Sequence, residues 1–293
     1  MLGDAARHSV SIATPNADGS WASTKCWHFT SGNYIKHTLA DGTLHYPGAN
    51  NMTIAFWWKK PILSGSHGFT GSCIPVGLKS GNKTVIGLVG HEAFDGGIQN
   101  MYVRIPRNSG AGYSTMSMGS SPYYSSIYND DCSSGSDLWD GWVFTTLSYT
   151  HSGATTNNIF LDNACYDNLG PVFLGNNSYL INYLNQDNNV QIGGNHSFYI
   201  RELGIWHTVL DESNKTALYN NGSPIDFKTD VGNYNQSSSL KAYWRFGDGT
   251  GDNPANHLND EEDDATTINM DLTGVDSFYG TINQVPVSSV GGS

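Results

Sequence analysis

The fold is decided by the stretch Ser197-Phe-Tyr-Ile-Arg-Glu-Leu-Gly-Ile-Trp-His-Thr-Val-Leu210. Its apolar and β-prone residues, among them Phe198, Ile200 and Ile205, indicate a long strand. The alternation of apolar and polar positions changes parity near Glu202–Leu203. One extra residue in a strand shifts the parity in this way, so the sequence predicts a β-bulge at that point.

A short helix is predicted directly after this strand. Asp211 or Ser213 can accept hydrogen bonds from the first free backbone amides of a helix. Asn220-Asn221-Gly222 can end the helix through a left-handed turn. Leu240–Phe246 is then predicted to be an aromatic strand. A long strand, a short helix and a closing strand, in this order, predict the last part of a β-sandwich.

Three ordered motifs support this interpretation. They are Met52-Thr-Ile-Ala-Phe-Trp-Trp-Lys59, then a predicted hairpin of Gly141–Tyr149 with Asn158-Ile-Phe-Leu-Asp-Asn163, and the segment from Gly193 to Gly222. Together they resemble the laminin G-like domains of the concanavalin A-like jelly-roll superfamily, over roughly Cys26 to Phe246. The resemblance implies an all-β fold, a two-sheet antiparallel jelly-roll sandwich with one short helix. Asn163 stands where the family has Gly.

The chain is predicted to consist of one domain with polar arms at both ends. Residues 1–20 have no periodicity and are expected to form an N-terminal arm. Residues 21–247 are expected to form the laminin G-like domain, and residues 248–293 an acidic C-terminal extension. Within that extension, Met270–Val287 could add an edge strand or run along another subunit.

Two stretches of the domain raise more specific expectations. Trp21–Ile35 is predicted to form the first strand pair, around the turn-forming residues Ser31-Gly-Asn33. The stretch from about 106 to 140 is long and rich in Ser, Gly and Tyr. A segment of that length without regular structure indicates a functional loop, an insertion or an unrecognised strand pair, and all three alternatives stay open.

The net charge of −12 is concentrated at the C-terminal end. Nine acidic residues and no Lys or Arg follow Phe246, so the other 17 acidic residues share the first 246 positions with 14 basic ones. Binding to a phosphate backbone needs clustered Lys and Arg, so nucleic acid is not an expected partner. The acidic run Asp260–Asp264 is predicted to be a solvated surface or a tail.

The N-terminal residues and the cysteines indicate in which cellular compartment the protein is expected. Residues 1–8 lack the apolar core of a signal peptide, and the longest apolar runs are too short to span a bilayer. The expectation is synthesis in a cytoplasm, without membrane insertion. The four cysteines form no C-x-x-C pair, which disfavours a zinc ribbon, while two disulfides and buried free thiols both stay open for Cys26, Cys73, Cys132 and Cys165.

Enzymatic activity is not expected. Family 16 glycoside hydrolases share the jelly roll and carry Glu-x-Asp-x-Glu on one strand, which places two acids on one face about 5 Å apart. None of the five glutamates stands in such a register: Glu92, Glu202, Glu212, Glu261 and Glu262. The chain also lacks a Gly-x-Ser-x-Gly elbow, a His-Glu-x-x-His helix and a Walker loop.

A calcium site is the expected cofactor site, because relatives of this fold often hold Ca²⁺ at a loop edge through hard oxygen ligands. Asp162 and Asn163 stand at the family's Asp-Gly turn, and Asp95 lies in a Gly-rich turn. Asp248 and Asp252 lie in the Gly-rich stretch Asp-Gly-Thr-Gly-Asp-Asn. The alternative for each position is that Asp, Asn and Gly only build turns.

Aromatic residues of the long loop are the predicted ligand-binding residues, because a flat ring complements the C–H side of a sugar. They are Tyr113, Tyr123, Tyr124, Tyr128 and Trp139. The alternative is that these rings pack the insertion or a subunit contact. The tryptophans in predicted strands are expected in the core instead: Trp57, Trp58, Trp142, Trp206 and Trp244.

A second resemblance concerns the function. The end of the domain, the acidic linker and the segment Thr267–Val287 are similar to the ends of laminin G-like proteins of tailed phages. This implies a non-enzymatic virion protein, such as a capsid decoration, appendage or tail-fibre component. The expected partners are other virion proteins, further copies of the chain in a homo-oligomer such as a trimer, and host-surface glycan. A free-standing lectin and a polysaccharide-degrading enzyme are the alternatives.

Overall fold

The computed structural model describes the chain in separate segments. These are residues 23–38, 51–59, 72–73, 76–80, 83–92, 98–106, 113–117, 142–151, 157–164, 172–176, 188–194, 197–220, 224–255, 257–258, 260–261, 270–271 and 277–287. Among these residues, no helix is long and apolar enough to cross a membrane.

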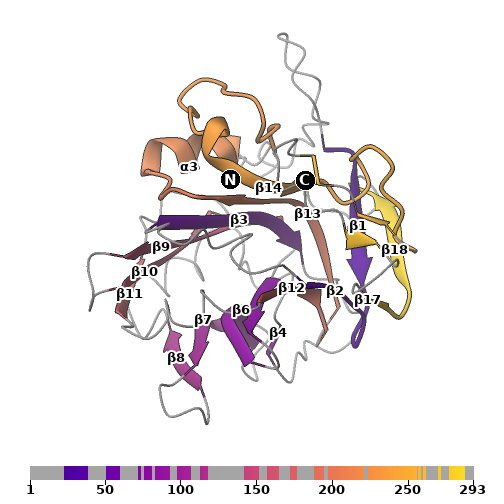
Figure 1. Ribbon diagram of the computed structural model, residues 1–293, viewed down its shortest axis with the longest axis horizontal. Coiled ribbons are helices and arrows are strands. Elements are labelled where there is room, and N and C mark those ends of the chain that lie inside the picture. The colour runs from indigo at the N-terminus through magenta and orange to yellow at the C-terminus, as the bar shows by residue number, and fades with distance from the viewer. Residues whose placement is uncertain are drawn as a thin grey trace, which may run out of the picture.

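The described strands form two large antiparallel sheets, so the predicted all-β jelly-roll sandwich is confirmed (Figure 1). Sheet A contains, in spatial order, β11 (Val172–Asn176), β10 (Asn157–Ala164), β9 (Val143–His151), β3 (Asn51–Lys59), β13 (Phe198–Trp206), β1 (Lys25–Phe29) and β18 (Ile282–Pro286), with β14 (Leu240–Trp244) also paired to β13. Sheet B contains β17 (Ser277–Tyr279), β2 (Tyr34–Thr38), β12 (Asn188–Gly193), β5 (Val76–Ser80), β6 (Lys83–Glu92), β7 (Ile98–Pro106) and β8 (Tyr113–Ser117), with β4 (Ser72–Cys73) paired to β6. A separate small sheet pairs β15 (His257–Leu258) with β16 (Met270–Asp271).

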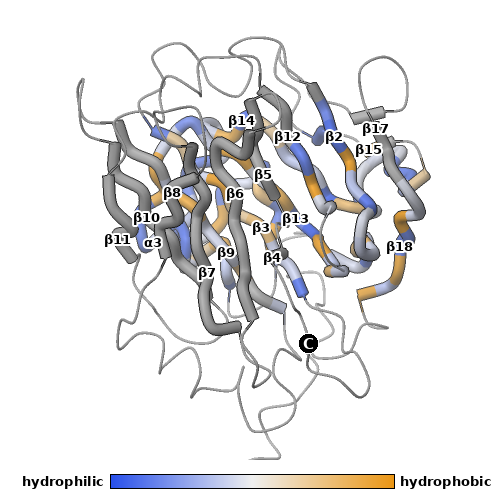
Figure 2. Tube along the Cα trace, turned by 90° about the horizontal axis from the view of Figure 1, so that it is seen from below, coloured by the Kyte–Doolittle hydropathy of each residue, from blue (hydrophilic) through white to orange (hydrophobic). Residues whose placement is uncertain are grey.

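The central strands of sheet A are buried on both faces. Sheet B lies on one side of it, and the helix α3 (Glu212–Tyr219) with its following loop lies on the other (Figure 1). The strand β3 shows the result, because all its residues from Met52 to Lys59 are buried. This explains its imperfect alternation, since a strand covered on both faces is apolar throughout. Near one edge of sheet B, hydrophobic and hydrophilic residues alternate along β12, while β2 carries one strongly hydrophobic residue, Ile35 (Figure 2).

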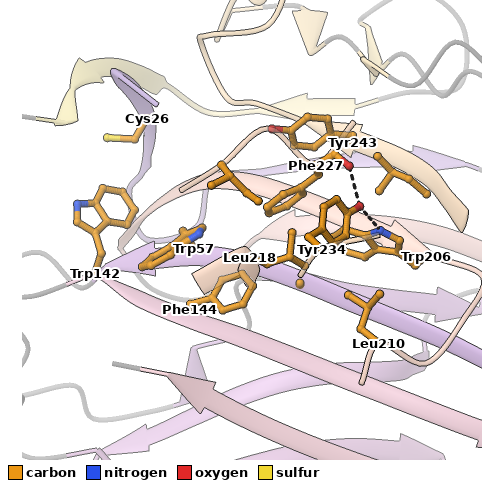
Figure 3. Close-up of a cluster of buried hydrophobic side chains, with 13 residues drawn as sticks. Cys26, Trp57, Trp142, Phe144, Trp206, Leu210, Leu218, Phe227, Tyr234 and Tyr243 are labelled. Atoms are coloured by element: carbon orange, nitrogen blue, oxygen red, sulfur yellow. Dashed lines mark hydrogen bonds between the residues drawn. The ribbon is translucent and has the colours of Figure 1, made fainter. Parts of the chain in front are cut away.

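The layer that covers the outer face of sheet A is held by one cluster of buried side chains, called the outer cluster below (Figure 3). Its members are Cys26, Ala55, Trp57, Trp142, Phe144, Trp206, Leu210, Leu218, Ile225, Phe227, Tyr234, Leu240 and Tyr243. Inside it, the indole Nε1 of Trp206 donates to Tyr234 Oη at 2.9 Å, and Tyr234 Oη donates to the Phe227 carbonyl at 2.7 Å. The polar atoms of both rings are thus satisfied within an apolar layer. The tryptophans predicted for the core are all buried, with Trp142 the most exposed at 7%.

The helix α3 begins and ends where the sequence predicts. Asp211 is the N-cap and its Oδ1 accepts the Asn214 backbone N–H at 2.8 Å. Asn220 ends the helix in a left-handed conformation with φ 43°. Both ends are decided by local chemistry, which is why the sequence pattern locates them.

The predicted bulge in the long strand is also confirmed. Against β3, the register of β13 shifts between Arg201 and Leu203, and the extra residue is Glu202 with φ 48°. A bulge that places a non-glycine residue in the left-handed region is held in place by the structure around it.

The prediction of a first strand pair over Trp21–Ile35 is wrong. The turn exists, because the Asn33 N–H donates to the Thr30 carbonyl at 3.0 Å. However, β1 belongs to sheet A and β2 to sheet B, so the turn carries the chain from one sheet to the other. Turn residues report a reversal or a corner in the chain, but not which strands pair on either side of it.

Two strands from the region beyond Gly247 complete the edge of the sandwich at this corner. β18 pairs with β1 and β17 pairs with β2, so the two segments form one antiparallel ribbon that bends across both sheets. At the bend, Asn33 Nδ2 donates to the Thr281 carbonyl at 2.6 Å. Of the two alternatives for Met270–Val287, the structure shows edge strands; the domain boundary drawn at Gly247 stays a prediction.

Part of the acidic run is not a solvated tail, contrary to expectation. Asp260 is only 2% exposed, and its Oδ1 accepts the Tyr243 N–H at 2.8 Å. The Glu261 N–H donates to the Tyr243 carbonyl at 2.8 Å. The start of the run therefore lies against β14, because a carboxylate that accepts a backbone hydrogen bond can be buried.

Candidate functional site

The predicted ligand-binding aromatics are only partly within the described residues. Tyr113 is the first residue of β8, where it pairs with Pro106 of β7. The strand β8 shows that the stretch 106–140 contains a strand that the sequence left open. Tyr123, Tyr124, Tyr128 and Trp139 lie outside the described residues, so their role stays a prediction.

The first predicted calcium position does not lie in a turn. Asp162 and Asn163 are inside β10, paired with Thr146 and Thr145 of β9. The predicted hairpin of these two strands is confirmed, but β10 continues to Ala164. With Asn163 in the place of the family's Gly, the backbone stays extended. Asp95 lies outside the described residues.

The carboxylates of Asp248 and Asp252 bind backbone amides. Asp248 Oδ2 accepts the N–H groups of Thr24 and Lys25 at 2.7 and 2.8 Å, and Asp248 Oδ1 accepts the Thr24 hydroxyl at 2.7 Å. Asp252 Oδ2 accepts the Gly247 N–H at 2.6 Å and the Gly249 N–H at 3.1 Å. This arrangement fits the alternative that these residues build turns.

Within the described part of the chain, no group of three or more His, Cys, Asp or Glu side chains is placed to hold a metal ion. The hydrogen-bonded positions above explain this for two candidates, because their oxygens point at N–H donors. The calcium expectation stays a prediction for Asp95, Asp162, Asn163, Asp248 and Asp252.

Asp248 therefore acts as a clamp between the start of β1 and the turn after β14. We expect Asp248→Asn to lower the free energy of unfolding by about 1–2 kcal/mol, because its amide group cannot accept all three hydrogen bonds. Urea unfolding followed by tryptophan fluorescence measures the change. Glu212→Gln removes an exposed charge of the same sign from α3 and is the control; an equal loss in both variants would contradict the clamp.

The most unusual chemistry lies at a point of β13 that we call the fork. Here β13 changes its second neighbour: residues 198–200 pair with β1, and residues 203–206 pair with β14. The bulge residue Glu202 sits between the two and is 0% exposed. Tyr243 of β14 donates its phenolic hydrogen to Glu202 Oε2.

Burial dominates the electrostatics of the fork. It raises the pKa of Glu202 to about 8, against the opposing effects of Arg245 and the Tyr243 hydrogen bond. Burial also raises the pKa of Tyr243 well above its usual value, and the nearby Glu202 adds to this. Desolvation disfavours the charged form of any acid, so Glu202 is neutral over most of the physiological range.

Beside the fork, a cation is held between two indole rings. The guanidinium carbon of Arg201 lies 4.2 Å from the ring centre of Trp142 and 5.3 Å from that of Trp57. Burial lowers the Arg201 pKa to about 10, so the group stays charged and the stacking is a cation–π interaction. Cys26 is a free buried thiol, and burial raises its pKa to about 12.

Sequence reasoning missed the fork as a site. Glu202 was located as the bulge, and a carboxylate at a parity break inside an apolar strand is the signal that could have found it. Its partners Tyr243 and Arg245 are more than forty positions away, so no spacing pattern links them.

Comparisons with known proteins find matches among solved structures, but none among family models or curated proteins. Among solved structures, the SAP-like pentraxin of Limulus polyphemus is similar with a TM-score of 0.44 and 10% identity, over 78% of this chain and 90% of that one.

Two further solved structures are similar over smaller shares of their own chains. The botulinum neurotoxin serotype D binding domain has a TM-score of 0.40 and 13% identity, over 71% of this chain and 49% of that one. The alginate lyase of Klebsiella pneumoniae has a TM-score of 0.35 and 10% identity, over 54% of this chain and 60% of that one. Scores this low carry no functional argument, so the fold assignment rests on the strand pairing itself.

Proposed function

We propose that the chain is a non-enzymatic virion structural protein whose jelly-roll domain adheres to host-surface glycan. The observation that carries the adhesive part is the position of Tyr113. It opens β8, which is the last strand in the order of sheet B, and the Tyr-rich stretch follows this strand in the sequence. A tyrosine ring has a flat apolar face that complements the C–H side of a sugar.

The use of the acidic side chains supports the non-enzymatic part. Asp211, Asp248, Asp252 and Asp260 each accept at least one backbone N–H. Carboxylates bound in this way stabilise turns and strand ends. Their pattern is that of a scaffold.

Glycan binding is tested with Tyr113→Ala on a panel of immobilised bacterial surface polysaccharides. We expect about a tenfold weaker binding, equivalent to about 1.4 kcal/mol, because the stacking face is lost. Tyr113→Phe keeps the flat ring and is the matched control, expected to bind nearly as the parent does. Equal binding by all three proteins would contradict a role for Tyr113.

The virion part of the proposal is supported by the resemblance of the C-terminal sequence to phage proteins, and its test is assembly. The mass in solution of the full-length protein should be that of a defined oligomer, such as a trimer, and removal of residues 1–20 should lower it. The C-terminal region must stay in place, because β17 and β18 belong to the two sheets. A full-length monomer would instead favour a free-standing lectin, the second candidate, which shares the Tyr113 edge.

A further inference from the structure

The fork is a junction of strands with one buried acid, Glu202, at its centre and the Asp248 clamp beside it. On one side of Glu202, Phe198 and Ile200 pair with β1, and on the other, Leu203 pairs with Trp244 of β14. Through β1, the fork also supports β18, which is bound to β1 along its whole length. A change at Glu202 therefore reaches the N-terminal and C-terminal strands of sheet A together.

The carboxyl group of Glu202 is only half satisfied. Tyr243 donates to Oε2, while Oε1 has no hydrogen-bond partner among the described residues. Ser23 Oγ is buried near the same carboxyl and, as a donor, lowers the Glu202 pKa, but the two groups do not reach the geometry of a hydrogen bond in this arrangement. A buried carboxyl with one free oxygen suits a neutral acid and is costly for a carboxylate, which needs several donors.

Charged and titratable groups on the elements packed against the fork influence Glu202 and its neighbours. Arg245 follows β14 and favours the carboxylate, whereas Asp248, in the turn beyond it, disfavours the carboxylate. Arg201 precedes the bulge on β13, where it also acts on Cys26 of β1. Two further groups act on neighbours of Glu202: Asp226 raises the pKa of Tyr243, and Lys59 of β3 lowers the pKa of Cys26.

We propose that Glu202 is a proton-operated latch: as the neutral acid it locks the bulge of β13 against β14, and as the carboxylate it releases the fork and the β1–β18 ribbon with it. The device is independent of any glycan or virion role. It makes the closure of this edge of the sandwich depend on pH.

The direction of the effect follows from linkage. The folded fork keeps the Glu202 proton up to about pH 8, whereas an opened fork loses it above the ordinary value of 4.5. Between these limits, opening releases one proton, so it becomes about tenfold more favourable per pH unit as the pH rises. Above about pH 8 the proton is lost in both states and the dependence levels off.

Cys26 is a built-in reporter of this opening. It is 0% exposed, and its Sγ lies 3.6 Å from the Val285 carbonyl of β18, within the ribbon that the latch holds. A thiol reagent cannot reach it in the closed structure, and opening of the ribbon removes the β18 contact that helps to cover it. The other three cysteines are replaced by serine so that labelling reports on Cys26 alone.

The experiment compares the labelling rate of Cys26 by Ellman's reagent in the full-length protein and in its Glu202→Gln variant, from pH 5.5 to 9. Glutamine mimics the neutral acid and accepts a hydrogen bond from Tyr243. The thiol's own reactivity depends on pH in the same way in both proteins, so the ratio of the parent rate to the variant rate at each pH reports on the opening alone. We expect this ratio to rise about tenfold per unit up to about pH 8 and then to level off. A ratio that does not change with pH would overturn the latch.

A second variant keeps the test decisive if Glu202→Gln folds poorly. Tyr243→Phe keeps the acid and the ring but removes the hydrogen bond that lowers the Glu202 pKa. For the variant and for the parent, the labelling rate is divided by the rate of the same protein unfolded in urea. We expect this normalised rate to level off at a higher pH in the variant than in the parent. An unchanged level-off point would show that Glu202 does not control the opening.

Discussion

A chain that ends at Asp276 is expected to lose its cooperative unfolding transition. This truncation removes β17 and β18, which pair with β2 and β1. It uncovers Cys26, Trp27 and Phe29 of β1, all of which are 0% exposed. The lost burial of Ile282 and Val285 together with the lost strand hydrogen bonds amounts to about 5 kcal/mol or more. This is comparable with the whole stability of many domains.

Near-ultraviolet circular dichroism and urea unfolding measure this loss. The control is a chain that ends at Ser288, which retains both strands and is expected to unfold within about 0.5 kcal/mol of the full-length protein. If the chain ending at Asp276 unfolded at the same urea concentration as this control, the C-terminal ribbon would not be part of the stable fold.

Trp206→Ala is expected to have the second largest effect, a loss of about 3–5 kcal/mol in the free energy of unfolding. Trp206 is 0% exposed within the outer cluster, where it packs against Phe227 with a ring-centre distance of 5.2 Å. The space it fills is bounded tightly, since a Cβ on Gly204 would lie 2.5 Å from its ring. Removing the indole leaves a cavity between sheet A and the helix layer, and it leaves Tyr234 without its donor.

Two milder variants separate packing from hydrogen bonding at this position. Tyr234→Phe keeps the packing but leaves the buried Trp206 Nε1 without an acceptor, at an expected cost of about 1–3 kcal/mol. Trp206→Phe keeps part of the ring, so its loss in the free energy of unfolding should lie between those of Tyr234→Phe and Trp206→Ala. Thermal and urea unfolding of all three variants give the order of their stabilities. If Trp206→Ala were as stable as Trp206→Phe, the packing argument would be contradicted.

Features decided by neighbouring residues were predictable. The N-cap at Asp211, the left-handed end at Asn220 and the bulge at Glu202 each follow from a few consecutive side chains. The hairpin formed by β9 with β10 was predictable for the same reason, because its strands are close in sequence.

The candidate site was less predictable. Asp248 and Asp252 were singled out as oxygen ligands, but whether an Asp oxygen meets a metal or an N–H depends on the backbone that folds around it. The donors at Asp248 come from Thr24 and Lys25, more than two hundred positions away. The composition of a loop does not contain that information.

The sequence by itself determined that this chain is a β-sandwich with one capped helix and a tryptophan-rich core, because apolar alternation, caps and bulges are local patterns. Only the tertiary structure decided that β1 and β2 part into different sheets, that the C-terminal strands close both, and that Glu202 is buried at the fork beside Tyr243. Strand partners and buried charges depend on contacts between distant segments, and those contacts form only when the whole sandwich is assembled.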